Sequence, residues 1–271
     1  MKRIAIGIIL SLSTVAARLV VRGTDAPADD AQSSVECRRE RIGGARYRVC
    51  ELTPAGVARL ELVARDGRGR PLGTIARADS VLRARGERLL FATNAGLYHT
   101  ADSTTGMLVA DGGLLYARLN RSAGPLNPCS VANFYCPPNG VFFVADDRAG
   151  VLSTEDFARR PAFAAAVRLA SQSGPMLVRR GELARAFPPA GASRLIRNGV
   201  GVRKDGSVVF AISDEGVNFH QFATAFRDGL RCPDALFLDG TISKLYTGSG
   251  AVPAQSRPFA AMFVVTQPST R

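Results

Sequence analysis

Short apolar runs bounded by turn residues dominate the hydrophobic pattern of this chain. The run 235–238 (ALFL) has no polar break and ends at Asp239-Gly240. Similar runs occupy 89–93, 140–145 and 259–265. An uninterrupted apolar run of about four to eight residues between turn signals is typical of a strand buried on both faces. We therefore predict buried strands at these places, with the 235–238 strand at the centre of the protein.

Alternating and paired segments predict most of the remaining strands. Alternation of apolar and polar residues favours strands at 45–52 and 56–64. Pairs of segments that flank glycine-containing turns predict hairpins at 107–110 with 114–117, 175–178 with 183–186, and 198–203 with 208–213. The apolar segment 164–170 fits either a strand or a helix.

Apolar residues at helical spacing predict a few helices. The segment 74–85 has this spacing, and Thr154 can start a short helix. A clearer helix follows Asn218, a good N-cap, and its apolar face consists of Phe219, Phe222, Ala223, Phe226 and Leu230. His220 and Arg227 lie off that face, which favours solvated side chains over catalytic ones. Many hairpins with few helices predict an α+β fold: a single domain with mixed, mostly antiparallel sheets and a few packed helices.

The first 17 residues have the pattern of a secretory signal peptide. A positive end precedes the apolar stretch 4–15, and small residues follow it. Because a bilayer-spanning helix needs roughly 20 residues, this stretch favours a signal over an anchor, although an uncleaved anchor is the alternative. Residues 18–36 are polar and small and are predicted to be a disordered linker, with the folded domain over 37–271. We therefore expect a periplasmic or secreted protein without stable membrane insertion after signal cleavage.

The formal net charge of +12 suggests an anionic partner. Nucleic-acid binding is one reading of such an excess, but the basic residues are scattered and form no stripe or tail. An arginine-rich surface also suits anionic cell-envelope material and phosphate-bearing substrates. We therefore expect no nucleic-acid partner. The sequence leaves the oligomeric state open.

The cysteine and histidine content bears on disulfides and metals. The chain has five cysteines: Cys37, Cys50, Cys129, Cys136 and Cys232. Export makes disulfides plausible, and we expect Cys37–Cys50 and Cys129–Cys136, with Cys232 left over. A catalytic Cys232 with His220 as its base is the less favoured alternative to a buried thiol. With two histidines and no metal-binding motif, we expect no metal and no cofactor.

Several predicted strands end in a polar residue beside glycine. These positions are Asn94 near Gly96, Ser173 with Gly174, Asp239 with Gly240, and Arg194 and Arg197 before the strand that starts at Asn198. Polar groups at strand ends on a rigid core form many binding sites, although each pair taken alone also fits a plain turn. A guanidinium matches phosphate in bidentate geometry, so Arg197 or Arg194 suits an anion clamp. Asn94 and Ser173 suit hydrogen bonds to sugar hydroxyls.

Five ordered motifs resemble the phosphodiester glycosidase family. They are FATNAGLYH (91–99), LNPCSVANFYCPPNGVFFV (126–144), SQSGPMLV (171–178), SRLIRNGVGV (193–202) and DALFLDGTISKLY (234–246). The resemblance covers roughly residues 45–266. It implies an α+β catalytic domain and cleavage of a sugar–phosphate diester at the anomeric bond. Thr241 departs from the small residue that many members have there, and the Pro-Cys and Cys-Pro pairs leave the roles of Asn133 and Asn139 in doubt.

Together, the motifs and the resemblance name a set of candidate site residues. The predicted catalytic residues are Asp239, Arg197 and Asn94, and the predicted substrate-binding residues are Gly96, Ser173, Gly174, Arg194, Asn198, Gly240 and Ser243. We expect an exported hydrolase of glycosyl phosphodiesters, with an arginine phosphate clamp and a strand-end aspartate that acts as nucleophile or base. Asp214 and Glu215 are candidates for a second acid. The alternative function is a non-enzymatic envelope protein that binds anionic glycans.

Overall fold

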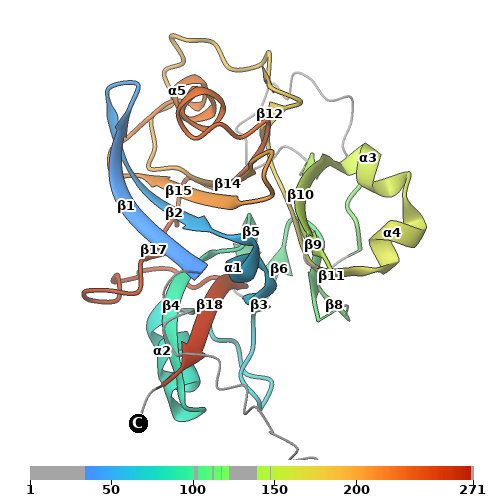
Figure 1. The fold of residues 1–271 in the computed structure, drawn as a ribbon, viewed down its shortest axis with the longest axis vertical. Coiled ribbons are helices and arrows are strands. Elements are labelled where there is room, and N and C mark those ends of the chain that lie inside the picture. Colours follow the sequence, from blue (N-terminus) through green and yellow to red (C-terminus); the bar gives the residue numbers. More distant parts are fainter. Residues whose placement is uncertain are drawn as a thin grey trace, which may run out of the picture.

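Three antiparallel sheets surround one core in the computed structural model, which describes residues 34–100, 103–111, 113–116, 118–121, 139–146 and 148–269 (Figure 1). The largest sheet has seven strands in the order β1 (Val35–Ile42), β2 (Ala45–Leu52), β15 (Val208–Ser213), β14 (Asn198–Val202), β16 (Asp234–Asp239), β12 (Met176–Arg179) and β13 (Glu182–Leu183). Every strand pair in the described ranges is antiparallel, which confirms the predicted α+β class.

Two smaller sheets close the other sides of the core. The five-stranded sheet has the order β10 (Arg148–Ser153), β9 (Gly140–Ala145), β11 (Val167–Ser173), β7 (Leu108–Ala110) and β8 (Gly113–Tyr116). The four-stranded sheet has the order β17 (Leu245–Tyr246), β4 (Glu87–Asn94), β18 (Met262–Pro268) and β3 (Leu60–Val63), and a small ribbon pairs β5 (Tyr98–Thr100) with β6 (Ser103–Thr104). Phe142, Phe210 and Phe263, one from each large sheet, pack ring against ring where the sheets meet.

Strand β16 is buried on both faces, as its uninterrupted apolar run predicts. Leu236 and Leu238 belong to the core shared by the three sheets. Ala235 and Phe237 point the other way, into the core beneath the helix α5 (Phe219–Thr224). Because side chains alternate along a strand, only a run without polar breaks can face two apolar layers.

Most of the helices cover the outer faces of the sheets (Figure 1). α5 begins with a capping box between Asn218 and Gln221 and continues into the π-helical turn η3 (Ala225–Gly229) over the seven-stranded sheet. α2 (Ile75–Ala84) lies on the four-stranded sheet, where Ile75, Ala78 and Leu82 are buried. α3 (Thr154–Ala158) and α4 (Pro161–Ala165) cover the five-stranded sheet. The predicted helices after Thr74, Thr154 and Asn218 are therefore confirmed.

The prediction of one strand over 56–64 is wrong. The segment forms the helix α1 (Pro54–Ala58) and then β3. Thr53 caps α1 by accepting a hydrogen bond from the Gly56 backbone N–H, and Pro54 occupies the first turn. A threonine followed by proline is a helix start signal that outweighs the alternation of the following residues. The ambiguous segment 164–170 contains the end of α4 and the start of β11.

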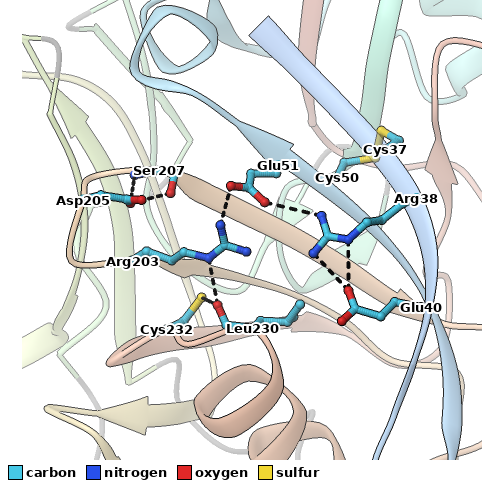
Figure 2. Close-up of polar contacts among 10 residues, drawn as sticks. All are labelled: Cys37, Arg38, Glu40, Cys50, Glu51, Arg203, Asp205, Ser207, Leu230 and Cys232. Carbon is cyan, nitrogen blue, oxygen red and sulfur yellow. Dashed lines mark hydrogen bonds and ion pairs between the residues drawn. A yellow bond between two sulfur atoms is a disulfide. The ribbon is translucent and has the colours of Figure 1, made fainter. Parts of the chain in front are cut away.

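The N-terminal hairpin β1–β2 is held to the rest of the sheet by covalent and ionic contacts (Figure 2). Cys37 and Cys50 face each other in the hairpin register and form the predicted disulfide. Arg38 pairs with Glu40 and with Glu51, and Glu51 also pairs with Arg203 at the end of β14. These contacts join β1, β2 and β14 on one side of the sheet.

Three sequence predictions fall wholly or partly on residues that the structure does not describe. The signal peptide, most of the linker and the Cys129–Cys136 disulfide lie outside the described residues, as does Asn133. The linker prediction runs to residue 36, whereas β1 begins at Val35. In the described part of the chain, no helix has the length and apolar character needed to cross a membrane.

Candidate functional site

Asp239 ends the central strand with one carboxylate oxygen held and the other open. Its Oδ1 accepts hydrogen bonds from the backbone N–H groups of Thr241 (2.5 Å) and Ile242 (2.6 Å). Within the described residues, Oδ2 has no hydrogen-bond partner, and the whole residue is 5% exposed. The turn that follows the strand therefore fixes the carboxylate and leaves one oxygen for chemistry.

Burial raises the pKa of Asp239 above its ordinary value. The backbone N–H groups of Ile242, Thr241 and Gly240 oppose this shift, and so does the charge of Arg257. A carboxylate with a raised pKa is a better proton acceptor than an exposed aspartate. Perturbed groups of this kind are frequent at functional sites.

A buried amide network supports the end of β16 from behind. Asn198, which pairs with Asp239 across β14 and β16, donates its Nδ2 hydrogens to Asn94 Oδ1 (2.8 Å) and Thr93 Oγ1 (3.0 Å). Asn198 Oδ1 accepts from Ser243 Oγ at 3.1 Å, and that hydroxyl also lies 2.8 Å from the Asp239 carbonyl oxygen. The network thus ties β4, β14 and the turn after β16 together.

A second buried contact joins Gly96 to the end of β11. Gly96 has a φ of +128°, and a Cβ added there would lie 3.1 Å from Ser171 Oγ and 3.6 Å from Ser173 Oγ. Ser171 donates to the Ala95 carbonyl, and Ser173 reaches the Leu238 carbonyl at 3.4 Å. Glycine is needed at 96 both for this backbone conformation and for the close approach.

Tyr98, which lies in the 91–99 motif but was not among the predicted site residues, fixes the same loop. Its hydroxyl accepts from the Ala95 N–H (2.6 Å) and donates to the Ala261 carbonyl (2.5 Å). Burial raises the pKa of Tyr98 well above its ordinary value, and the negative charge of Asp239 acts in the same direction.

Arg197 is a buried cation with no carboxylate partner in the described residues. The side chain is 1% exposed, and its Nε donates to the Val217 carbonyl at 2.9 Å. Its Nη2 donates to the carbonyl (3.0 Å) and hydroxyl (3.2 Å) of Ser193, and the guanidinium lies 3.7 Å from the centre of the Phe219 ring. The remaining nitrogen, Nη1, faces Gly240, at 3.5 Å from the position of an added Cβ.

The charge of Arg197 is retained despite its burial. Desolvation lowers the pKa of Arg197 to about 10, so the guanidinium is protonated at neutral pH. A buried charge without an opposite charge is costly and is a place where an anionic ligand gains affinity. Neutral carbonyls and an aromatic face hold the cation in position without cancelling it.

A pocket of about 130 Å³ opens over the turn after Asp239. It is lined by Ile196, Gly240, Thr241, Ile242, Ser243, Lys244, Gln255, Ser256 and Arg257. Lys244 lies within the 234–246 motif but was not among the predicted site residues, and the segment 255–257 escaped sequence analysis because no periodicity or motif marks that loop. Gly240 has an ordinary negative-φ backbone, so it serves close approach rather than an unusual turn.

The other predicted site residues lie in different surroundings. Arg194 is exposed and donates to Gln221 Oε1 at 2.9 Å, so Arg197 is the better placed of the two arginines. Gly174 is buried and precedes Pro175 through a cis peptide bond. Asp214 pairs with Arg48, and Glu215 accepts from the Arg46 backbone N–H, so both carboxylates are already engaged.

The structure also bears on a catalytic cysteine and on a metal site. Cys232 is a free, buried thiol, and burial raises its pKa to about 12, which keeps it protonated and unreactive at neutral pH. Among the described residues, no group of three or more His, Cys, Asp and Glu side chains is arranged to hold a metal ion.

Comparison with known proteins places the chain in a family. The model of the phosphodiester glycosidase family matches residues 87–266. The uncharacterized protein YigE of Escherichia coli (strain K12) is 33% identical over 207 residues, which cover 76% of this chain and 77% of YigE. The matched family range contains Asn94, Ser173, Arg197 and Asp239.

Two solved structures share the fold. The catalytic domain of zebrafish N-acetylglucosamine-1-phosphodiester alpha-N-acetylglucosaminidase, auto-inhibited by its pro-peptide, superimposes with a TM-score of 0.55 at 16% identity, covering 85% of this chain and 81% of that one. A hypothetical protein from Synechocystis gives a TM-score of 0.53 at 14% identity and covers 86% of this chain and 62% of that one. With the family match over residues 87–266 and the similarity to YigE, the chain belongs to the phosphodiester glycosidase family.

Proposed function

We propose that this protein is an exported hydrolase that cleaves a glycosyl phosphodiester at the anomeric bond. One observation carries the proposal: Nη1 of a buried guanidinium, which has no carboxylate partner in the described chain, faces Gly240, the residue directly after the strand-end carboxylate of Asp239. The first group suits the phosphate and the second suits the anomeric carbon. Membership of the family supports this reaction class.

Arg197 stabilises the departing phosphate in this scheme. When the bond between the anomeric carbon and the phosphate oxygen breaks, both bonding electrons stay on that oxygen, and a phosphate monoester leaves. The negative charge that develops there is stabilised by Arg197 Nη1, which is held in advance by Val217, Ser193 and Phe219. Such a leaving group needs less acid assistance than an alkoxide.

Asp239 supplies the carboxylate on the sugar side. Its Oδ2 either attacks the anomeric carbon to form a glycosyl ester that water then hydrolyses, or removes a proton from the attacking water. In both routes the oxygen of water ends on the sugar. In the general-base route one water proton passes to the carboxylate and then to solvent. In the nucleophilic route the carboxylate leaves the sugar as water attacks, and the water proton goes to solvent. The raised pKa favours the proton-accepting step.

The remaining residues position these two groups. Asn94 and Asn198 are buried and bind each other, so we assign them to holding the end of β16 rather than to contact with substrate. Ser173 and Gly96 form the packed wall behind the carboxylate. Ser243 lines the pocket, and its hydroxyl binds Asn198 and the Asp239 carbonyl, so we assign it to holding the turn.

The disulfide supports export. Disulfides form and persist mainly in oxidising compartments, and the chain contains Cys37–Cys50. Together with the signal-like residues 1–17, it favours a periplasmic or secreted protein. The test is the N-terminal sequence of the protein recovered from the periplasm and medium, where an intact residue 1 contradicts a cleaved signal.

Incubation of the purified mature protein with a panel of glycosyl phosphodiesters tests the activity. The expected result is release of free sugar together with a phosphate monoester, detected by mass spectrometry, and loss of both products in Asp239→Asn. Binding without turnover of every member of the panel would instead support an envelope protein that binds anionic glycans. Equal retention of any polyanion, lost at modest salt, would favour nucleic-acid or other polyanion binding.

A further inference from the structure

The pocket over the turn after Asp239 has an excess of positive charge. Its lining contains Lys244 and Arg257 and no aspartate or glutamate. Neither cation forms an ion pair with a carboxylate in the described part of the chain, whereas Arg38, Arg48, Arg70 and Arg203 all do. In the described residues the two cations therefore lack a direct ion pair, and the charge of Arg257 also acts on the carboxylate of Asp239.

Gln255 also belongs to this lining and has an amide nitrogen that is unpartnered in the described residues. Its Oε1 accepts the backbone N–H of Ile75 at 2.6 Å, and this donor fixes which end of the amide is oxygen. The other end, Nε2, is buried and has no hydrogen-bond partner in the described residues. A buried amide nitrogen without a partner is costly to the fold unless a ligand accepts its hydrogens.

The size and position of the pocket limit its ligand. At about 130 Å³ it is slightly smaller than an engineered cavity of roughly 150 Å³ that binds benzene, so it holds one small group. The lining starts at Gly240, the residue next to Asp239, and Arg197 Nη1 faces the same glycine. A group in the pocket is therefore adjacent to the bond that the proposed reaction breaks.

We propose that this pocket is a second anion subsite, and that the substrate carries a further carboxylate or phosphate next to the scissile phosphodiester. This inference rests on the proposed function, because Arg197 is assigned to the scissile phosphate there. Two cations and one amide donor match the oxygens of a single oxyanion. The substrate class is thus an anionic glycosyl phosphodiester rather than a neutral one.

Matched substrates and variants test this subsite. The substrates are one sugar 1-phosphate esterified with methanol, with glycolic acid or with glycerol phosphate, and the corresponding uronic acid as its methyl phosphodiester. The test variants are the Lys244→Gln/Arg257→Gln pair and Gln255→Glu. The second variant keeps an oxygen for the Ile75 N–H and replaces the donor by a negative group. The control pair, Lys204→Gln/Arg148→Gln, removes the same charges from exposed positions elsewhere.

The readout is the ratio of kcat/KM for charged and neutral substrates at fixed ionic strength. We expect the wild type and the control pair to prefer a charged substrate by roughly tenfold or more, and both test variants to bring the ratio near one. A preference for the uronic acid substrate would place the second charge on the sugar, and a preference for the glycolic acid or glycerol phosphate ester would place it on the leaving alcohol. A wild-type ratio near one overturns the proposal. An unchanged ratio in the test variants also overturns it, since the preference would then arise outside the pocket.

A binding measurement separates failure of this inference from failure of the proposed function. Calorimetric titration with glycerol 3-phosphate, with glycerol as the neutral reference, requires no turnover. We expect affinity for glycerol 3-phosphate to fall about tenfold in both test variants and to stay unchanged in the control pair. If no substrate is cleaved but this pattern appears, the subsite stands and the proposed reaction fails. Equal affinity in all four proteins overturns the subsite.

Discussion

The arginines at the two ends of the β14–β16 strand pair have different partners. At one end, Arg203 pairs with Glu51 and donates to the Leu230 carbonyl, so its charge is balanced (Figure 2). At the other end, Arg197 is more deeply buried and has only neutral partners in the described residues. The same sheet therefore supplies one arginine for structure and leaves another for a ligand.

The aspartates of β16 show the same contrast. Asp234, at the start of the strand, accepts from the Arg180 N–H near the surface. Asp239, at the end, is buried, and its pKa is raised. A protein that needed only stability would replace or pair such buried charges, because unpaired ones are costly. We therefore interpret the charges of Arg197 and Asp239, which have no ion-pair partner in the described residues, as serving function.

Asp239→Asn, at the end of the strand pair assigned to function, should reduce turnover the most. Loss of the carboxylate removes the nucleophile or base, and we expect turnover to fall by at least roughly 10²-fold. Asparagine keeps an oxygen for the Thr241 and Ile242 N–H groups, so the protein should still fold and bind product. Turnover and the thermal midpoint are measured together. Wild-type turnover would remove Asp239 from the catalytic assignment.

Arg197→Lys should have the next largest effect. Lysine keeps the charge but loses the planar fork that Val217, Ser193 and the Phe219 ring hold in place. We expect a loss of about 10²-fold in kcat, as for removal of one preorganised donor. The matched control is Arg203→Lys at the other end of β14, which should leave kcat unchanged. Similar kinetic losses in both variants would contradict the contrast between the two arginines.

Removal of the Cys37–Cys50 disulfide should affect stability and not catalysis. Its sequence separation of 13 residues predicts a loss of about 2–3 kcal/mol of unfolding free energy in the Cys37→Ser/Cys50→Ser variant. Denaturant titration measures the loss, and kcat at a temperature where the variant remains folded provides the second readout. A fall in kcat under those conditions would show that the β1–β2 hairpin influences the geometry of the site.

Local pattern was sufficient to predict the elements but not the site network. The apolar run of β16 and the capped face of α5 were predictable because each depends on nearby residues. The bond between Asn94 and Asn198 joins positions 104 residues apart, and the Gln255 contact with Ile75 spans 180. No periodicity encodes such contacts. The sequence predicted Arg197 as a site residue from its guanidinium and its motif. Only the structure revealed that it lacks a carboxylate partner in the described residues.

Asp239 also predicts a small stability effect that depends on pH. Its pKa is raised in the folded state, so its contribution to stability is present below the unfolded pKa of about 3.9 and is lost as pH rises through the folded value. Asn cannot ionise and avoids this loss. We therefore expect Asp239→Asn to be slightly more stable than wild type near pH 7, with the difference shrinking on acidification toward about pH 4. Thermal midpoints of both proteins across this range provide the measurement. A variant that is less stable than wild type at pH 7, by a margin that shrinks as acidification protonates the wild-type carboxylate, would show that the carboxylate holds the turn by its charge, and Asp239 would then have a structural role.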